Sequence, residues 1–410
     1  MSNESMNMLT IGVGSMLNVI REHIEDEMYN TPLLFLGKSG IGKTESVMAL
    51  AKEMGIAVKE YRLITTNETE LMGIPSIEKD AEGHSFSTYA PNELLPNEER
   101  DGERGILLFD EITSCTANVR TAAMQLMDVS RKVGTYRLPK KWLIVCLGNG
   151  EEDGGNFNGM EFAFLNRCIC YNVECVLDCT DPSKGLGWIQ WALANNVNSS
   201  VISFVRNNPD LLHKFNTDDP ASLFPSPRSW TILSRKLNLR EDKNGGKPLA
   251  EQSSLIYSAG TVGASAGRQF SIYYKCKADM VDVDDILTGK IRLQDVRMER
   301  SALQMTYTSL IQKLFAYIDP DMQVTPESIR KGGGQLSLSD KTIGYLSIFI
   351  DIIVNASAGI GAGVREDAIF LWDNFTAKYG NVAYGALPKV PNYNEFRASK
   401  LYAELSLIKG

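Results

Sequence analysis

The residues of this 410-residue chain with the clearest chemical meaning form a glycine-rich loop. The run from Leu33 to Thr44, LLFLGKSGIGKT, ends in the pattern G-x-x-x-x-G-K-[ST]. Glycines let the backbone curl so that several N–H groups point at the phosphates of a nucleoside triphosphate, and a helix that follows adds the positive end of its dipole. We expect the nucleotide to be bound by Gly37, Lys38, Ser39, Gly40, Ile41, Gly42, Lys43 and Thr44.

Two side chains of this loop have specific roles in such a site. Lys43 supplies a positive charge to the phosphates, and the Thr44 hydroxyl supplies a ligand for Mg²⁺. The loop stands between an apolar, strand-like run at 33–36 and a helical run from Glu45 to Met54, which is the setting that the site requires. The alternative is a glycine loop without a ligand.

An acidic pair ends a second strand-like run, Gly105 to Ile112 (GILLFDEI). A buried parallel strand delivers side chains to its C-terminal edge, where ligands bind in α/β proteins. Asp110 would hold the Mg²⁺, directly or through water, and Glu111 would polarise the water that attacks the γ-phosphate. Such a pair alone often only begins a solvated loop, but its place after the glycine loop favours the catalytic interpretation.

Three further polar residues follow in order. Asn149 comes after the strand-like run Trp142 to Gly148, where its amide could orient the attacking water, although asparagine at a strand end is commonly a turn residue. Arg167 ends the run FLNR before another strand-like run, Cys168 to Val176, and Arg228 lies in the run PSPRSW. Each arginine alone would be interpreted as a surface charge, so the inference depends on their order.

In this order the motifs resemble the Walker A, Walker B, sensor 1, arginine finger and sensor 2 motifs of AAA+ ATPases. Three segments narrow the resemblance to the MoxR-like branch: Glu68 to Pro75 is similar to its insertion helix, Tyr136 to Trp142 to its run into sensor 1, and Ser258 to Phe270 to a lid-helix segment. The resemblance covers about residues 10 to 270. The chain departs from many relatives in the longer run GNGEEDGG that follows the sensor strand.

The resemblance implies that ATP is the nucleotide and that Asn149 senses its γ-phosphate. It implies that Arg167 is a finger that reaches into a neighbouring subunit's site and that Arg228 is a lid residue that contacts phosphate. The oligomer would be a homo-oligomeric ring, by analogy a hexamer, and the partner a protein, with a von Willebrand A domain protein as the candidate. The expected fold is α/β: a three-layer αβα core with a parallel sheet, an α-helical lid and a mostly helical C-terminal extension.

We therefore expect three regions: a nucleotide-binding core at 1–180, a lid carrying sensor 2 at 181–275, and the extension at 276–410. The tail, Leu387 to Gly410, could form an arm on a neighbouring subunit, pack on its own chain or be disordered. We expect a leading helix at Leu17 to Met28, lid helices at Ser183 to Ala194, Val201 to Phe215 and Ser229 to Leu239, and polar or glycine-rich loops at Arg240 to Gln252 and Lys331 to Gly334.

Composition narrows the class of partner. The net charge is −8 and no long basic run occurs, so nothing indicates a general nucleic-acid surface, although a pore loop could still bind DNA locally. The insertion from Glu68 to His84 is mixed and rather acidic, which favours protein remodelling over a nucleic-acid motor or loader. A nucleotide-gated assembly scaffold is a third hypothesis. Seven cysteines without a small-scaffold pattern and the lack of a signal peptide predict the reducing cytoplasm.

Two segments invite other interpretations. Cys168, Cys170, Cys175 and Cys179 suggest zinc, but their spacing lacks paired C-x2-C knuckles, so we expect free core cysteines without metal. The apolar stretch from Ile343 to Val364 is long enough to span a membrane, but an acid at mid-span, here Asp351, costs about 3 kcal/mol on insertion. A buried helix that ends in a glycine-rich turn is the prediction. The run ASAGIGAGV within it is weak evidence for a dinucleotide loop, since no strand precedes it.

Overall fold

The computed structural model describes residues 8–150, 160–178, 185–216, 219, 222–322, 336, 338–358 and 362–407. The chain divides into two compact units. The α/β unit comprises Met1–Gly187, Phe215–Ser222 and Ser226–Arg228, and the helical unit comprises Trp188–Lys214, Leu223–Pro225 and Ser229–Gly410. The predicted division of the helical part into a lid and an extension near residue 275 stays a prediction.

The α/β unit is built on a six-stranded sheet whose paired strands are all parallel. Short, continuously apolar strands are typical of sheets that are covered on both faces. The predicted strands at 33–36, 105–112, 142–148 and 168–176 are confirmed, with ends shifted by one or two residues. In spatial order the strands are β1 (Thr10–Gly12), β10 (Ile169–Glu174), β2 (Leu33–Gly37), β9 (Lys141–Gly148), β6 (Arg104–Asp110) and β3 (Ala57–Arg62).

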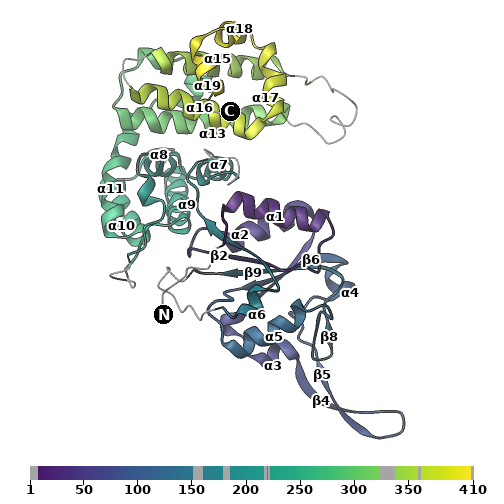
Figure 1. Cartoon of the computed structure of the whole chain (residues 1–410). Helices are drawn as coiled ribbons and strands as arrows, with labels where there is room; N and C mark the ends of the chain where they lie inside the picture. Colours follow the sequence, from purple (N-terminus) through teal and green to yellow (C-terminus); the bar gives the residue numbers. More distant parts are fainter. Residues whose placement is uncertain are drawn as a thin grey trace. The chain divides into compact units, whose positions relative to one another are not determined.

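Helices cover both faces of this sheet (Figure 1). Successive strand residues point to opposite faces, so Leu33 packs in one core with α1 (Val13–Glu25) and α2 (Lys43–Met54). Leu34 packs in a second core with α5 (Ala117–Met127). Both cores consist of nearly fully buried apolar side chains. The predicted three-layer αβα core with a parallel sheet is confirmed, as is the leading helix, which begins and ends a few residues earlier than expected.

Between β3 and β6 the chain forms a short helix and then a β-hairpin. The helix ends at Met72, earlier than the predicted insertion helix of Glu68 to Pro75, and Pro75 lies in a strand. Gly73 makes the turn with a φ of 95°, and a Cβ there would lie 2.4 Å from the Ala90 carbonyl oxygen, so only glycine fits. The elements of this insertion are η1 (Leu63–Thr65), α3 (Glu68–Met72), β4 (Ile74–Lys79) and β5 (Ser85–Ala90).

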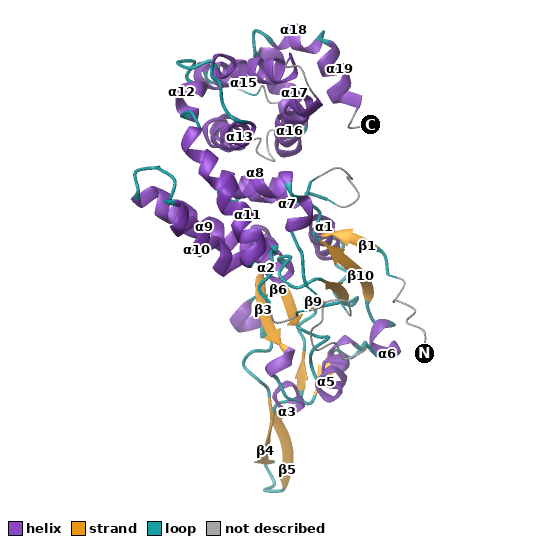
Figure 2. Ribbon diagram, turned by 90° about the vertical axis from the view of Figure 1, so that its left-hand side faces the viewer, coloured by secondary structure: helices purple, strands orange, loops and turns teal. Residues whose placement is uncertain are grey.

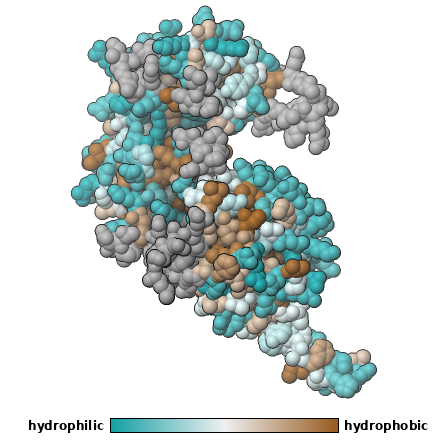
Figure 3. Space-filling view, in the orientation of Figure 1, coloured by the Kyte–Doolittle hydropathy of each residue, from teal (hydrophilic) through white to brown (hydrophobic). Residues whose placement is uncertain are grey.

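The hairpin of β4 and β5 extends away from the sheet (Figure 2). Ile74 and Ile77 expose 70% and 80% of their surface, and Phe86 and Tyr89 are also exposed. In the space-filling view, hydrophobic residues stand among hydrophilic ones on this projection (Figure 3). A two-stranded hairpin has little core of its own, so these apolar side chains remain in contact with solvent in the isolated chain.

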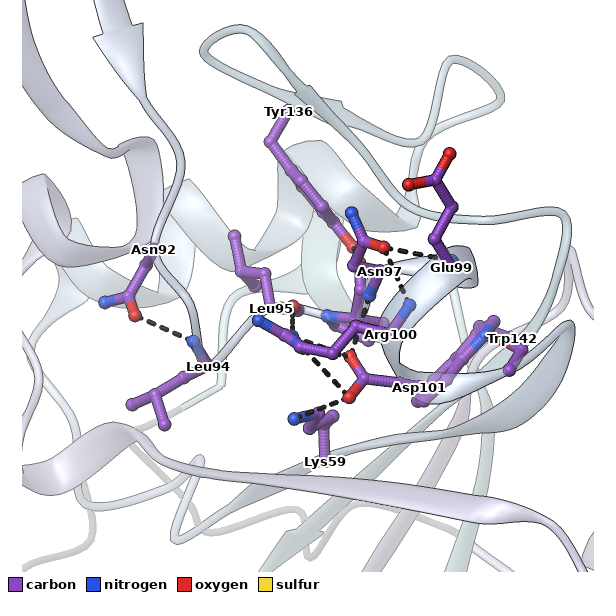
Figure 4. Close-up of polar contacts among 12 residues, drawn as sticks. Lys59, Asn92, Leu94, Leu95, Asn97, Glu99, Arg100, Asp101, Tyr136 and Trp142 are labelled. Atoms are coloured by element: carbon purple, nitrogen blue, oxygen red, sulfur yellow. Dashed lines mark hydrogen bonds and ion pairs between the residues drawn. The ribbon is translucent and has the colours of Figure 1, made fainter.

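The segment that returns from the hairpin to β6 is held by polar contacts (Figure 4). The Asn97 side chain caps the short helix α4 (Glu98–Asp101). Asp101 forms an ion pair with Lys59 of β3 at 2.9 Å, and the Trp142 indole N–H of β9 donates to the Gly102 carbonyl oxygen at 3.1 Å. These contacts tie the start of β6 to its two neighbouring strands.

Two small elements complete the α/β unit. A two-stranded ribbon lies between α5 and β9, and a one-turn helix precedes β10. Their bounds are β7 (Lys132–Val133), β8 (Tyr136–Arg137) and α6 (Phe162–Leu165).

The helical unit packs around buried aromatic side chains, among them Trp230 and Phe204, whose ring centroids lie 5.6 Å apart. Its longer helices are α7 (Trp188–Ala194), α8 (Ser199–Asn207), α9 (Pro227–Lys243), α10 (Glu251–Val262), α11 (Ala264–Tyr274), α13 (Arg300–Met322), α15 (Asp340–Ala358), α16 (Ala362–Tyr379) and α19 (Lys400–Leu407). Its shorter ones are η4 (Pro209–Leu211), η5 (Lys275–Asp279), α12 (Val283–Leu287), η6 (Leu293–Asp295), α17 (Asn381–Ala386), η7 (Leu387–Lys389) and α18 (Tyr393–Arg397).

The predicted polar loop at Arg240 to Gln252 is wrong at both ends, because α9 continues to Lys243 and α10 begins at Glu251. The reason is a tertiary contact: the buried Glu241 carboxylate accepts hydrogen bonds from the Tyr274 hydroxyl and the Lys277 ammonium. The predicted helix from Val201 to Phe215 ends at Asn207, before Pro209 begins η4. The first residues of the predicted helix at Ser183, like the loop at Lys331 to Gly334, lie outside the described residues.

Two predictions on the C-terminal part have clear outcomes. The predicted helix is confirmed from Ile343 to Ala358. Residues 359–361 of the predicted glycine-rich turn lie outside the described residues, and α16 begins at Ala362. The described part of the tail packs on its own chain, since Phe396 is buried with its ring centroid 5.3 Å from that of Trp372. No helix among the described residues combines the length and hydropathy needed to cross a membrane.

The described cysteines of the 168–179 cluster lie on opposite sides of β10. Cys168 and Cys170 pack against one core of the α/β unit, and Cys175 packs against the other. Burial raises the pKa of the Cys168 and Cys175 thiols to about 12. Thiols placed in this way do not converge on one ion; Cys179 lies outside the described residues, and the lack of metal stays a prediction.

The close packing of β6 against β9 gives a stability prediction. A Cβ on Gly105 would lie 2.7 Å from two ring carbons of Trp142 and 2.8 Å from the Ala57 carbonyl oxygen. We expect Gly105→Ala to lower the free energy of unfolding by about 1–3 kcal/mol through overpacking, measured by urea unfolding followed by circular dichroism. Gly344→Ala is the control, since a Cβ in that exposed helical position meets open space. An unchanged midpoint for Gly105→Ala would contradict the packing.

Candidate active site

Three neighbouring strands of the sheet end at one edge and bring the predicted site residues together. β2 leads into the glycine loop, β9 into Asn149, and β6 into Asp110 and Glu111. Leu36 of β2 is in register with Gly148 of β9, which places the ends of these strands side by side. In open α/β sheets, ligands bind outside the carboxyl ends of the strands, so this edge is the candidate site.

The glycine loop has the backbone conformation of a phosphate cradle. Gly40 and Gly42 have φ angles of 79° and 95°, which glycine adopts without strain. The Lys43 side chain is buried, and its ammonium donates hydrogen bonds to the carbonyl oxygens of Gly37 at 2.6 Å and Lys38 at 2.9 Å. The loop therefore curls around a positive charge. The 12-residue helix α2 begins at this point, so the N–H groups of its first turn also favour an anion.

Thr44 and Asp110 form the contact that joins the glycine loop to β6. The Thr44 hydroxyl donates a hydrogen bond to Asp110 Oδ2 at 2.8 Å. Oxygen ligands in neighbouring octahedral positions of Mg²⁺ lie about 3 Å apart, since each is about 2.1 Å from the ion. The two side chains therefore fit a shared Mg²⁺ ion, to which they could supply neighbouring ligands.

Glu111 is held in a strained backbone conformation. Its φ is 58°, in the left-handed region that a non-glycine residue occupies at a cost of about 1–3 kcal/mol. Its N–H donates to Asp110 Oδ1 at 2.9 Å, and its carbonyl oxygen accepts from the Ser114 N–H at 3.0 Å. The Ile112 N–H donates to the Leu147 carbonyl oxygen of β9 at 3.0 Å. These bonds fix a sharp turn directly after Asp110, which is the type of strain found at functional sites.

Asn149 lies between the glycine loop and the turn at Glu111. Its amide Oδ1 is 3.5 Å from the Lys43 ammonium, and its N–H donates to the Thr113 hydroxyl at 3.1 Å. A Cβ on the preceding Gly148 would lie 2.7 Å from the Thr113 methyl group, so glycine permits this close approach. Thr113 therefore sets the position of Asn149, a role that the sequence analysis missed.

Arg228 lies beside the glycine loop within the α/β unit. Its N–H donates to the Gly40 carbonyl oxygen at 3.0 Å, and its guanidinium is 3.4 Å from a Glu45 carboxylate oxygen. The side chain is more than half exposed. Its placement next to the loop is compatible with contact to a bound phosphate.

The described contacts of Arg167 do not include any other residue of the predicted site. Its Nε is 2.7 Å from Asp128 Oδ1, and its Nη1 donates to the Ala163 carbonyl oxygen at 2.8 Å. The side chain remains 37% exposed. The alternative interpretation of Arg167, a pair with a nearby acid, thus describes a real contact, and a role as a finger stays a prediction.

Arg62 is a further residue that the sequence analysis did not select. It ends β3 in register with Asp110 of β6. The Glu60 carboxylate raises the pKa of the Arg62 guanidinium above its ordinary value, chiefly by hydrogen bonding, and the charges of Asp110 and Glu111 add to the effect. The sequence signal that could have identified Arg62 is its position as a polar residue at the end of the strand next to the acidic pair.

Among the described residues, one group of three possible metal ligands was found: Asp80, Glu82 and His84 at the tip of the β4–β5 hairpin. All three are exposed. Asp80 Oδ1 accepts hydrogen bonds from the N–H groups of the other two residues, as expected for a tight turn. We assign this group no ligand.

The comparisons with known proteins can be set beside this geometry. A family described as the AAA domain (dynein-related subfamily) matches residues 32–168, a span that runs from the start of β2 to the start of β10. No curated protein matches the chain. Among solved structures, the chain is similar to a candidate ATPase from Cytophaga hutchinsonii, with 17% sequence identity, a TM-score of 0.29, and coverage of 71% of this chain and 92% of that chain. We draw no conclusion from a likeness at that score.

The family match and the site agree in position. The matched span contains the glycine loop, the acidic pair, Asn149 and Arg167, and the sheet edge holds the first three together. A buried lysine in the loop and a hydroxyl–carboxylate pair of the right spacing are what a nucleotide site of this family needs. Residues 32–168 thus match the AAA domain in sequence and share its α/β fold, and the chain is an ATPase.

Proposed function

We propose that the chain assembles into a ring, by resemblance to the MoxR-like branch a hexamer, and hydrolyses ATP at sites shared between subunits to remodel or assemble a partner protein. The observation that carries this proposal is the placement of Arg167. Its contacts are with α5 and α6, and the neighbouring Phe162 exposes 82% of its surface. An exposed arginine beside an exposed aromatic residue is the composition expected at a protein interface.

The geometry of the sheet edge supports a hydrolysis mechanism. A water oxygen forms a bond to the γ-phosphorus while the bond from that phosphorus to the β–γ bridging oxygen breaks, giving ADP and phosphate. Glu111 accepts the proton of the water, and Asn149 orients the water or the γ-phosphate. Lys43 binds the phosphates. Thr44 and Asp110 would hold Mg²⁺, which would supply positive charge to the phosphates.

Arg167 would complete the site of the adjacent subunit, and Arg228 would contact phosphate within its own. Head-to-tail contacts of one surface with a different surface close into a ring when the rotation between subunits permits it. Release of the γ-phosphate removes the partner of Asn149, Arg167 and Arg228, and this loss of charge contacts would change the arrangement of core and lid.

The β4–β5 hairpin supports a protein as the substrate. Between Glu68 and Ala90 the sequence has five acidic residues and one lysine, which would repel a phosphate backbone. The exposed Ile74, Ile77 and Phe86 would instead contact apolar side chains. The resemblance implies a von Willebrand A domain protein as the partner. The described cysteines form no disulfide, which supports a reducing compartment, and we propose the cytoplasm.

The first test separates binding from turnover. Lys43→Ala removes the charge that contacts the ground-state phosphates, so we expect it to abolish ATP binding. Glu111→Gln keeps the shape of the site but not the base, so binding should persist while turnover falls about 10²- to 10⁴-fold. Equilibrium binding of labelled ATP and steady-state hydrolysis measure the two effects. Lys52→Ala, an exposed change on the same helix, is the control; unimpaired binding by Lys43→Ala would refute the assignment.

The second test asks whether the site is shared. An arginine finger acts mainly in the transition state, where it contributes about 10³ to 10⁵ in rate. Arg167→Ala should therefore bind ATP nearly normally and hydrolyse it very slowly. Mixed with Lys43→Ala, it should regain turnover, because random assembly of equal amounts places an intact loop beside an intact finger at about one interface in four.

Subunit exchange is verified in this experiment by native mass spectrometry of differently tagged variants. Each variant alone stays inactive, which is the control for contamination. Mixed oligomers without recovered ATPase activity would refute the shared site, since the alternative role of Arg167 in a structural ion pair predicts no rescue.

The third test separates a protein remodeller from a nucleic-acid motor. We expect single- and double-stranded DNA to leave the ATPase rate unchanged. A protein that co-purifies with ATP-bound Glu111→Gln should raise the rate of the wild type in a concentration-dependent manner, and Ile77→Ser should weaken this effect by removing an exposed apolar contact. Ser87→Ala, on the residue paired with Ile77, is the control. Stimulation by DNA alone would favour the motor.

A further inference from the structure

We propose that Asp128 is a positioning residue for Arg167: it holds the guanidinium of its own subunit in the orientation that the neighbouring subunit's ATP requires. This inference rests on the proposed shared site, because it assigns a role within that site. It concerns a residue that the motifs do not contain. Asp128 is the C-cap residue that directly follows α5.

Two contacts fix the plane of the guanidinium. Asp128 Oδ1 accepts from Nε at 2.7 Å, and the Ala163 carbonyl oxygen accepts from Nη1 at 2.8 Å. A guanidinium has five N–H donors in a rigid fork. With Nε and one Nη1 proton engaged, the donors of Nη2 have no partner among the described residues. They are the donors that remain for a ligand outside the subunit.

The short segment that precedes Arg167, which consists of Glu161 and α6, is held in place by α5. Arg120 of α5 is 1% exposed and forms an ion pair with Glu161 at 3.0 Å. Glu161 is the residue directly before α6, and Phe164 of α6 is fully buried in the core that includes α5. Contacts from α5 and its C-cap thus reach the chain on both sides of α6. Arg120 contacts Glu161 before α6, and Asp128 contacts Arg167 after it.

Positioning is the role that these contacts favour. A free arginine side chain loses much conformational entropy when it is ordered on a ligand, and prior anchoring removes part of that loss. The Asp128 carboxylate is 48% exposed, so water screens its charge and the guanidinium keeps much of its attraction for phosphoryl oxygens. Val129, next to Asp128, and Phe162, next to Ala163, are also exposed, as a subunit contact requires.

The test uses the mixed oligomers, because only there can the subunit that gives the finger be told from the subunit that gives the loop. In the parent mixture, Lys43→Ala supplies Arg167 and Arg167→Ala supplies the glycine loop. Asp128→Ala is added to one variant or to the other. On the finger donor, it should lower the kcat of the mixture about two- to fivefold, the range expected for an exposed ion pair, with an unchanged KM for ATP.

On the loop donor, the same change should leave the rescued rate unaltered, because that subunit has no finger for Asp128 to position. This arm is the matched control for folding and assembly. Equal losses in both arms, no loss in either, or a gain in the finger-donor arm would each overturn the role of Asp128 while leaving the shared site intact. A parent mixture without any rescue would overturn the shared site itself, and this role with it.

Discussion

Parallel strands that are covered on both faces must end together at one edge of the sheet, and every part of the candidate site depends on that constraint. The apolar side chains of β2, β9 and β6 are buried in two cores, so the last residues of these strands and the residues that follow them are the ones available for chemistry. Because these three strands are neighbours, the glycine loop, Asn149 and the acidic pair meet without any long side chain having to reach across the sheet. The hydrogen bond between Thr44 and Asp110 joins the glycine loop directly to β6.

The turn that follows β6 is held by hydrogen bonds to β6, to its own residues and to β9. The left-handed conformation of Glu111 persists because the bonds around it, from Asp110, Ser114 and Leu147, leave no alternative path for the chain. In the proposed role of Glu111 as the base, this placement is pre-organised, so less reorganisation is needed when charge develops on the phosphoryl group. The Thr113 hydroxyl, two residues after Glu111, accepts a hydrogen bond from the Asn149 backbone N–H and so connects this turn to the end of β9.

The sequence was sufficient for those parts of the fold that depend on local patterns. The core strands and the start of α2 follow from apolar runs and glycine positions, and the family match agrees with them. It was insufficient where a distant contact decides. α9 extends past the predicted end because Glu241 meets Tyr274 and Lys277 of later helices, and Asp128 is 39 residues from the arginine that it contacts. The roles proposed for the site residues follow from type and placement, and they remain for experiment to decide.

The position of α5 has a consequence for the order of events in an assembly. The helix begins at Ala117, just after the turn that carries Glu111 and Thr113, and it ends against the ion pair of Arg167. Helix α5 thus connects the turn of the proposed nucleotide site to Arg167, the residue proposed to act in the neighbouring subunit's site. In the proposed ring, a movement at the start of α5 would be accompanied by a movement at its end. A subunit that has lost its γ-phosphate would then move Arg167 out of the neighbouring subunit's site. ATP hydrolysis would then occur in one subunit after another rather than in all subunits at once. Its direction around the ring would be set by the side of the subunit that bears Arg167.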